Sequence, residues 1–579
     1  MANVSASRAG RRTAALCIGA AAIYAVAIGF TGMRGAASDS GDTIVSNSEF
    51  LLKGVAVPEP PDLATYVRDR QAAVALGKAL FWDAQAGSDG KTACASCHFN
   101  AGADNRATNS VNPGYNGTFT AGPNLVSVAA EFPFHKLSNP DVNTSTVMAD
   151  RDDVFGSQGV FLHSFIDVGS TAFDACSEEA DATFHVGGIN VRRVTGRQAS
   201  TNINAVFNFR NFWDGRASEN FNGANPRGQT DPNARIYRNI GGVLTPVSVL
   251  IANSSAASQA TGPALSGTEM SCDGRSWPKV GRKLLRLLPL DGQHVAADDS
   301  VLGPYYTSSN DGRGLNTTYA VMISNAFQPD LWNSSDSTTI GGTSYSQMEA
   351  NFSLYWGLAI QMYQSALVSD DAPIDQYLSG NTAALTEQQK QGLALFTGQA
   401  RCSQCHRGPI FSAATQKGGR SFVNVAVRPT AEDGGDVHVP GQGRFKVPTL
   451  RNIELTGPYF HNGGQSTLRQ VVDFYNRGGD FPDQFTDSQI RPLGLSSTEK
   501  DAIVAFLLSL TDERVRWKRA AFDHPELCVP NGQVGNGAQV SADGSSIDAK
   551  DVVLCLPAIG RGGMASPLTT FLGLAPNSR

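Results

Sequence analysis

Two short cysteine–histidine motifs are the residues best suited to chemistry. They are C-A-S-C-H at residues 94–98 and C-S-Q-C-H at residues 402–406. Two thiols at this spacing can form thioether bonds with the vinyl groups of one haem, and the next histidine is then held beneath the iron. A lone motif could be a redox dithiol or half a zinc site, but neither has further ligands at zinc-finger spacing. Two motifs predict two covalent c-type haems, bound by Cys94, Cys97 and His98 and by Cys402, Cys405 and His406.

Four more cysteines lie outside the motifs and beyond the N-terminal Cys17. An even number of cysteines in an exported protein favours disulfide bonds. Sequence proximity favours pairing Cys528 with Cys555, which leaves Cys176 with Cys272. Free thiols are the alternative.

The first 37 residues are typical of an export segment. Three arginines between residues 8 and 12 precede an uncharged, mostly apolar run at 13–30, and small residues follow at 35–37. This order predicts a secretory signal peptide and a periplasmic location. The apolar run is also marginally long enough for an uncleaved membrane anchor, which would be the chain's only contact with a membrane.

Size and charge exclude some classes of protein. The chain has 579 residues, which is enough for two or more domains with real cores. Its formal net charge is −6 and no long basic run occurs, so nucleic-acid binding is not expected.

Helices are expected to position the two motifs. Apolar spacing predicts a helix over 62–81, before the first motif, and another over 387–396, before the second, with Thr386 as its N-cap. A third is predicted over 497–510, with Ser496 as its cap. The two motif regions look like diverged copies of one helix–loop–haem unit. We therefore expect a mainly α protein made of two cytochrome c-like helical haem domains with long loops and insertions.

This interpretation divides the chain into four parts. Residues 1–37 form the signal peptide or anchor, and 60–340 form an N-terminal haem domain with an insertion. Residues 345–520 form a C-terminal haem domain, and 521–579 form an extension. The stretch 307–342, rich in Gly, Ser, Thr and Asn, is expected to be a linker or loop region between the halves.

Five longer stretches resemble the bacterial di-haem cytochrome c peroxidase and MauG family, in the family's order. The resemblance implies that the N-terminal haem reacts with hydrogen peroxide and that the C-terminal haem handles electron transfer. The matching stretches are LGKALFWD, TGRQASTNINAVFNFRNFWDGRA, ASQATGPALSGTEM, LTEQQKQGLALFTGQARCSQCHRGP and FKVPTLRNIELTGPYFHNGGQSTLRQVVDFY.

The resemblance also assigns catalytic positions. Trp213 matches the tryptophan that relays electrons between the haems; a core aromatic is the alternative. Glu269 matches the distal acid, whose carboxyl can take a proton from the near oxygen of peroxide and return it to the leaving oxygen. Gln259 and Pro263 match residues that accompany the distal acid in the family. The match to Glu269 crosses an insertion between residues 217 and 257.

One departure from the family concerns access to the first haem. Compact peroxidases carry a histidine in the loop before GRQAST that blocks the peroxidatic iron until the enzyme is reduced. Ungapped counting places Asn190 there, whereas His185 lies out of register and would need a gap. We expect the iron of the first haem to have an open sixth coordination position, as in MauG.

A second departure concerns the other haem. The peroxidases place a methionine about 14 residues after the histidine of PYFH, and here that position is Tyr475. MauG-type proteins have tyrosine there. Because a phenolate favours ferric iron, Tyr475 as a ligand predicts a low-potential C-terminal haem. The alternative is a packed Tyr475 with His461 or water on the iron.

The resemblance further implies a calcium ion between the haem domains. The matching positions are Gln198, Thr456 and Pro458. The family's usual asparagine is replaced by Gln198, and the other two act through backbone oxygens.

These features together favour a peroxide-reducing oxidoreductase. Its electrons would come from a small cytochrome c or cupredoxin, as in the peroxidases, or from a protein side chain, as in MauG. A dioxygenase resembling rubber oxygenase is a second hypothesis, but it would not need the carboxylate of Glu269. A non-enzymatic electron carrier is the third, and it would be expected to have two six-coordinate irons.

Overall fold

The computed structural model describes residues 48–579, so the predicted export segment lies outside the described residues. The described residues belong to one compact unit. Among them, no helix is both long enough and apolar enough to cross a membrane.

The expectation of a mainly α protein is wrong. The structure is 27% helical and 17% strand. Within residues 48–579, the strands form eight two-stranded sheets, and each is an antiparallel pair. The paired strands are β1 (Val111–Asn112) with β4 (Val154–Phe155), β2 (His135–Leu137) with β3 (Val147–Asp150), β5 (His163–Val168) with β6 (Asp174–Glu178), β7 (His185–Val186) with β8 (Ile189–Asn190), β9 (Ile236–Ile240) with β10 (Val243–Val247), β11 (Ser337–Ile340) with β12 (Thr343–Ser346), β13 (Phe422–Val423) with β14 (Phe445–Lys446), and β15 (Leu527–Gln533) with β16 (Asp551–Leu556).

Paired glycines explain several of these hairpins. Two glycines with positive φ connect β7 to β8, β9 to β10, and β11 to β12. A two-residue turn with positive φ at both positions matches the twist of antiparallel strands, and glycine adopts it without steric cost. Gly-Gly between short runs of strand-forming residues was therefore a hairpin signal that the helical interpretation overlooked.

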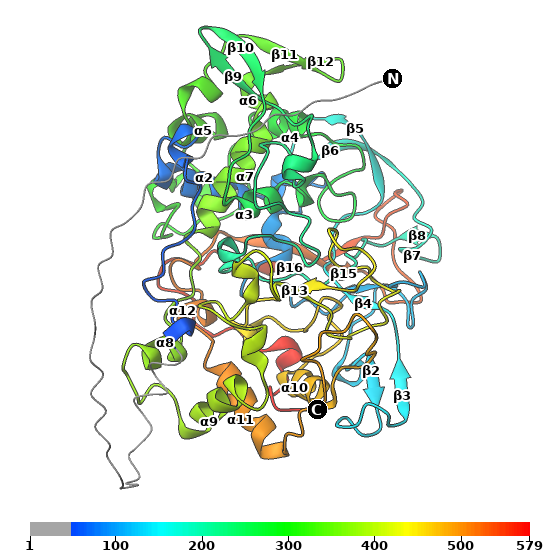
Figure 1. Ribbon diagram of the computed structural model, residues 1–579. Coiled ribbons are helices and arrows are strands. Elements are labelled where there is room, and N and C mark those ends of the chain that lie inside the picture. Colours follow the sequence, from blue (N-terminus) through cyan, green and yellow to red (C-terminus); the bar gives the residue numbers. More distant parts are fainter. Residues whose placement is uncertain (1–47) are drawn as a thin grey trace, which may run out of the picture. The chain divides into compact units, whose positions relative to one another are not determined.

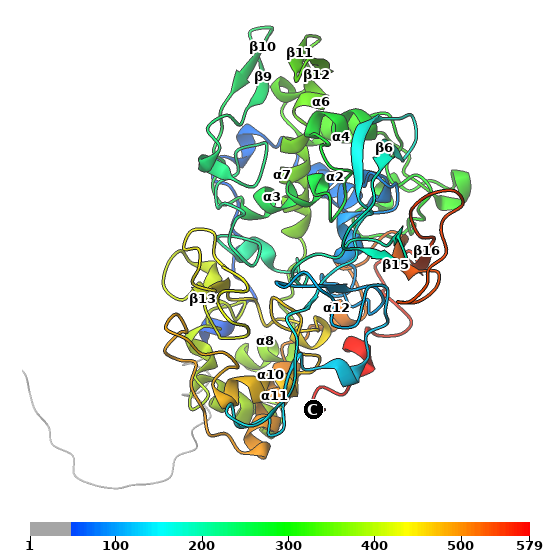
Figure 2. The same ribbon diagram turned by 90° about the vertical axis from the view of Figure 1, so that its right-hand side faces the viewer.

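The helices gather in two groups. Figures 1 and 2 show α2, α3, α4 and α7 toward one end of this unit and α10 and α11 toward the other, where Figure 1 also labels α9. The helices are α2 (Arg70–Trp82), α3 (Ser255–Ala260), α4 (Trp277–Leu284), α5 (Tyr319–Ala326), α6 (Gln347–Ala350), α7 (Phe352–Gln364), α8 (Pro373–Leu378), α9 (Glu387–Thr397), α10 (Leu468–Arg477), α11 (Ser497–Leu508) and α12 (Glu513–Arg516).

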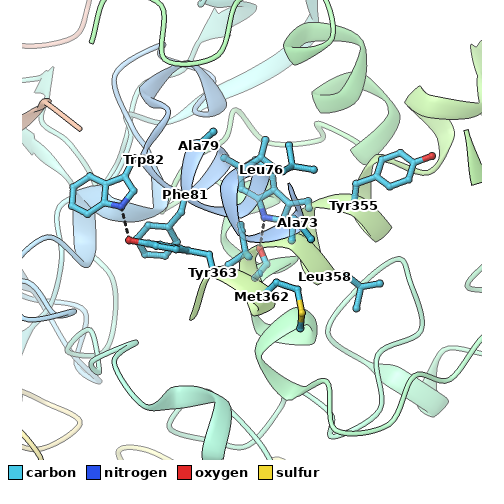
Figure 3. Packing of buried hydrophobic residues seen from close by; sticks show 14 of the residues in the cluster. Ala73, Leu76, Ala79, Phe81, Trp82, Tyr355, Leu358, Met362 and Tyr363 are labelled. Atoms are coloured by element: carbon cyan, nitrogen blue, oxygen red, sulfur yellow. Dashed lines mark hydrogen bonds between the residues drawn. The ribbon is translucent and has the colours of Figure 1, made fainter. Parts of the chain in front are cut away.

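Helix α2 packs tightly along α7 in the main core (Figure 3). The contact is close because Gly77 has no side chain: a Cβ there would lie 1.9 Å from the carbonyl oxygen of Ala359. Helix α7 lies beyond the expected domain boundary near residue 340. The first haem unit therefore draws on residues from both sides of that boundary.

Helices α9 and α11 repeat this arrangement. A Cβ at Gly392 would lie 2.0 Å from the carbonyl oxygen of Ala502 on α11. Gly77 in LGKALF and Gly392 in QGLALF occupy the same place in the two sequence copies. In both copies a glycine lets the helix before the motif approach the backbone of a partner helix.

The predicted helices occur, with some changes at their ends. Helix α9 begins after Thr386, and α11 begins after Ser496; both caps accept backbone hydrogen bonds within capping boxes. The first helix begins later than expected because Asp69 caps it, and only a 3-10 turn precedes it. The stretch 307–342 was expected to be a linker or loop but contains α5 and β11.

Both proposed disulfide pairings are confirmed. Cys176 of β6 is bonded to Cys272, and Cys528 is bonded to Cys555 across the β15–β16 hairpin of the C-terminal extension. The insertion at 217–257 contains the β9–β10 hairpin.

Candidate haem sites

The first motif follows α2 in a tight 3-10 turn, Cys94–Cys97. Neither cysteine forms a disulfide. The Nδ1 of His98 lies 2.7 Å from the carbonyl oxygen of Gly102. Since a carbonyl only accepts, Nδ1 carries the proton and Nε2 is left with a lone pair for a metal.

A cavity of about 490 Å³ opens beside this motif and is lined by both thiols and by His98. The charged groups of Glu269, Arg197 and Arg216 also line it. Two adjacent thiols, a histidine with a free Nε2 and a cavity of this size fit a covalently attached haem.

Glu269 lines the cavity, as do the predicted neighbours Gln259 and Pro263. Burial raises the pKa of the Glu269 carboxyl, and the positive charge of Arg216 opposes that rise. Burial raises the pKa values of the Cys94 and Cys97 thiols, and the negative charge of Glu269 raises them further. The carboxyl is therefore within electrostatic reach of the attachment thiols.

The two residues considered as a blocking ligand lie outside this cavity. Asn190 is buried, and its side chain donates to the carbonyl of Glu179 and to Asp548. His185 is exposed on β7. Among the described residues, His98 is the only histidine in the cavity lining.

The second motif follows α9, and its turn begins at Cys402. The Nδ1 of His406 lies 3.0 Å from the carbonyl oxygen of Phe411, so Nδ1 again carries the proton and Nε2 the lone pair. Cys402 and Cys405 form no disulfide. These residues line a second cavity of about 200 Å³, which is mostly apolar, and they also fit a covalent haem.

Both candidate sixth ligands line the second cavity. Tyr475 is partly buried on α10, and burial raises its pKa, with a further contribution from the nearby cysteines. His461 is buried and stacks on Phe445 with ring centroids 3.6 Å apart. Burial lowers the pKa of His461 to about 3, so it is neutral at physiological pH.

Trp213 lines both cavities. Its Nε1 donates to the carbonyl of Gln198 at 2.8 Å, and its ring meets that of His461 edge to face at 6.3 Å. The wall shared by the cavities also includes residues 198–201. The indole is thus held in the partition between the two sites.

The three residues matched to calcium ligands lie near this partition. The Nε2 of Gln198 is 3.3 Å from the carbonyl oxygens of Asp104 and Pro458. Its Oε1 is buried and has no hydrogen-bond partner in the described part of the chain. Thr456 and Pro458 line the second cavity. No cluster of three or more acidic, histidine or cysteine residues suited to a metal occurs within residues 48–579.

Some residues near the sites were not found from the sequence. Arg197 forms ion pairs of 2.7 Å with Asp214 and 2.8 Å with Asp433, which join segments far apart in sequence. Lys78 of α2 is buried against Asp299 and Asp523 at 2.8 and 3.3 Å. The only signal for Lys78 was a lone charge in an apolar helix, and its partners lie more than 200 residues away.

Comparisons with known proteins find curated relatives of similar sequence. The cytochrome-c peroxidase IdrP2 of Denitromonas iodatirespirans is 36% identical over 182 residues, covering 26% of this chain and 47% of that protein. The methylamine utilization protein MauG of Methylorubrum extorquens is 32% identical over 174 residues, covering 29% of this chain and 46% of that protein. The chain thus spans about half the length of these curated relatives.

Structural and family comparisons extend further along the chain. A crystal structure of a MauG-like protein associated with microbial copper homeostasis is 18% identical with a TM-score of 0.43, covering 80% of this chain and 95% of that chain. The family described as di-haem cytochrome c peroxidase matches residues 71–383, which is more than half of the 579 residues. The chain therefore belongs to the di-haem cytochrome c peroxidase family.

Proposed function

We propose that this protein is a di-haem c-type peroxidase-like oxidoreductase that reduces hydrogen peroxide with electrons from a redox protein or a protein side chain. The observation that carries the proposal is the first cavity. There Glu269 lines the same cavity as the attachment motif, and no histidine besides His98 is in the lining within the described residues. Such a cavity leaves room for a peroxide beside a carboxyl that can move its protons.

The haem bound at His98 would supply an iron centre able to coordinate and reduce peroxide. Glu269 would accept the proton of the near peroxide oxygen and deliver it to the far oxygen, which leaves as water. Two electrons and two further protons complete the reduction of one peroxide to two waters. Arg216 would help to keep Glu269 ionised as the base, since its positive charge opposes the rise in pKa caused by burial.

Trp213 would relay electrons between the two sites. Its position in the lining of both cavities supports this role, as does the hydrogen bond that fixes its indole. The edge-to-face contact with His461 ties the relay to the second cavity.

Tyr475 would ligate the second haem and hold it at a low potential. Its place in the lining beside the second motif supports this assignment. His461 is the alternative ligand, since stacking on Phe445 occupies only the face of its ring.

A calcium ion would bind between Gln198, Thr456 and Pro458. The buried Oε1 of Gln198 supports this site, because an unpaired buried oxygen is costly and a hard cation would satisfy it. The amide would turn so that its oxygen joins the carbonyl of Pro458 around the ion.

The N-terminal segment supports export to the periplasm, where a small cytochrome c or cupredoxin would be the electron donor. The test uses the purified di-haem protein with a reduced small cytochrome c. We expect two donor molecules to be oxidised for each peroxide consumed. No consumption of peroxide, together with a stable oxygen complex, would contradict the proposal and favour a dioxygenase.

A further inference from the structure

A third cavity, of about 410 Å³, lies apart from both haem cavities and shares no lining residue with them. One side is the segment just after the first motif, from Phe99 to Asn105. The other side is the C-terminal extension, between Leu554 on β16 and Thr569. Figure 2 shows the β15–β16 hairpin at the edge of the unit.

The lining of this third cavity is mostly apolar but contains one amine. Leu554, Leu556 and Met564 contribute apolar surface, while Lys518 and His524 contribute nitrogen. The Nδ1 of His524 donates to the carbonyl of Pro525 at 2.8 Å, so its Nε2 must accept from the Nζ of Lys518, also at 2.8 Å.

Lys518 is only 5% exposed, and no carboxylate within residues 48–579 forms an ion pair with it. Burial lowers the pKa of its amine to about 7. A buried amine with one hydrogen-bond partner still has one N–H group to satisfy when neutral and two when protonated. The cavity is therefore suited to a ligand with an apolar body and an oxygen that accepts a hydrogen bond.

A line of aromatic rings leads from this cavity to the first haem site. His524 stacks on Trp82 with ring centroids 4.4 Å apart. The Nε1 of Trp82 donates to the hydroxyl of Tyr363 at 3.0 Å (Figure 3). Phe81 then lies 5.5 Å from the Tyr363 ring and 6.2 Å from the ring of His98.

A small void of about 30 Å³ follows the same line, and its lining includes both His98 and Lys518. Trp82, Tyr363 and Phe81 are all buried. The line approaches His98 from α2 and α7, whereas Trp213 lies in the wall between the two haem cavities. These rings are thus separate from the relay assigned to Trp213.

We propose that the third cavity binds small phenols as electron donors and that Trp82 and Tyr363 carry their electrons to the first haem site. The phenol ring would lie against the apolar wall, and its oxygen would accept a hydrogen bond from Lys518. This inference rests on the proposed peroxide reduction for its oxidant.

The reaction balances with two phenols for each peroxide. Each phenol loses one electron through the rings and one proton to solvent at the open side of the cavity, and leaves as a phenoxyl radical. The two electrons and two protons reduce one hydrogen peroxide to two waters. A cavity of this volume accommodates a single substituted ring, which favours a small molecule over a protein donor.

Binding is tested first, by calorimetry on the di-haem protein with guaiacol as the phenol. We expect one site, at least fivefold weaker binding in Lys518→Met, and weaker binding in Met564→Trp, which narrows the cavity. Lys417→Met, at an exposed lysine, should bind as the wild type does. The analogue 1,2-dimethoxybenzene keeps the ring but has no phenolic hydroxyl to oxidise.

The electron route is tested with Trp82→Phe and Tyr363→Phe, the second of which removes only a hydroxyl. Each should lower guaiacol-dependent peroxide turnover at least tenfold while leaving guaiacol affinity unchanged. The organic-radical signal in electron paramagnetic resonance after peroxide addition should also fall. As controls, Trp332→Phe and Tyr355→Phe make the same changes at a tryptophan and a tyrosine outside the line of aromatic rings. They should change neither the turnover nor the radical signal.

The outcomes separate the two proposals. Equal turnover and equal radical signal in Trp82→Phe and wild type would overturn the route, and absent guaiacol binding would overturn the site. If the wild type binds guaiacol but does not reduce peroxide with any electron donor, the proposed peroxidase function is wrong, and the electron route is wrong with it. Oxidation of 1,2-dimethoxybenzene at the guaiacol rate would also contradict the phenol assignment.

Discussion

The two haem units share a backbone arrangement but hold different side chains. In each, a helix packs through a glycine against an alanine carbonyl of a partner helix and then enters the haem motif. In each, the motif histidine donates Nδ1–H to a backbone carbonyl. The first cavity is the larger, and acidic and basic side chains both line it. The second is smaller and more apolar, and its lining has basic but no acidic side chains.

From this contrast we expect haem attachment and haem reactivity to be set by different residues. The shared helices and motif fix where a haem sits. The other residues that line each cavity differ, with Glu269 and Arg216 in the first unit and Tyr475 and His461 in the second, and under the proposed function they decide what can approach each haem. Variants of these residues test whether they account for the difference between the two units.

The largest expected effect is on peroxide chemistry at the first site. Glu269→Gln keeps the shape but removes the proton carrier, so the rate of peroxide reduction should fall by about 10²- to 10⁴-fold, the usual contribution of general acid–base catalysis. Stopped-flow mixing with peroxide measures this rate. Glu219→Gln, at a carboxylate ion-paired with Arg210 and outside the linings of both haem cavities, serves as the control.

A rate for Glu269→Gln within a few-fold of wild type would remove the chemical distinction between the two cavities. Because the variant also lacks a negative charge near the attachment thiols, its haem content should be checked by the pyridine haemochrome spectrum.

The next largest effect is on the reduction potential of the second haem. In Tyr475→Met a neutral thioether replaces the phenol, so the potential should become more positive, within the roughly 0.8 V that axial ligands can span. Spectroelectrochemical titration measures it. Tyr459→Phe alters another tyrosine of the same cavity and should leave the potential near its wild-type value. Equal potentials in Tyr475→Met and wild type would show that Tyr475 is not a ligand.

A structural test addresses the shared part of the comparison. Gly77→Ala and Gly392→Ala each place a Cβ within 2.0 Å of a backbone oxygen, so the helices must separate. Overpacking of this kind costs about 1–3 kcal/mol in the free energy of unfolding. Chemical denaturation should give similar losses for both variants. A loss confined to one of them would argue against a repeated packing unit.

The smallest effect concerns pH at the first site. Burial raises the pKa of Glu269 above its ordinary value of 4.5, and only the ionised carboxylate can accept a proton, so the peroxide rate should rise with pH through this raised pKa. The charge of Arg216 lowers that pKa, so Arg216→Gln should raise it further and move the rising limb to higher pH. A limb that stays in place or moves to lower pH in the pH–rate profile would contradict this electrostatic account.

Much of the site could be predicted from the sequence because the evidence was local. The haem motifs, the caps at Thr386 and Ser496, and the Cys528–Cys555 pairing follow from residue types at short spacing, and Cys176–Cys272 is the pair that remains. Glu269 and Trp213 came from a family resemblance, and the structure brings them to the cavity and the partition. Their roles stay predictions.

Other features could not be predicted because they depend on contacts between distant segments. Nothing near Lys78 in the sequence points to Asp299 or Asp523, and nothing near Trp82 points to His524. The fold class was wrong for a different reason: helical spacing around the motifs was extended to loops whose Gly-Gly turns favour hairpins.

The coordination of the two irons before any reductant is added tests the central claim most directly. Electron paramagnetic resonance of the oxidised di-haem protein distinguishes a high-spin iron with an open position from a low-spin iron with six ligands. We predict one of each, with the high-spin signal lost from a His98→Gly variant and the low-spin signal changed in Tyr475→Met. Two six-coordinate low-spin irons in the oxidised protein would contradict the account, because neither cavity would then be open to peroxide.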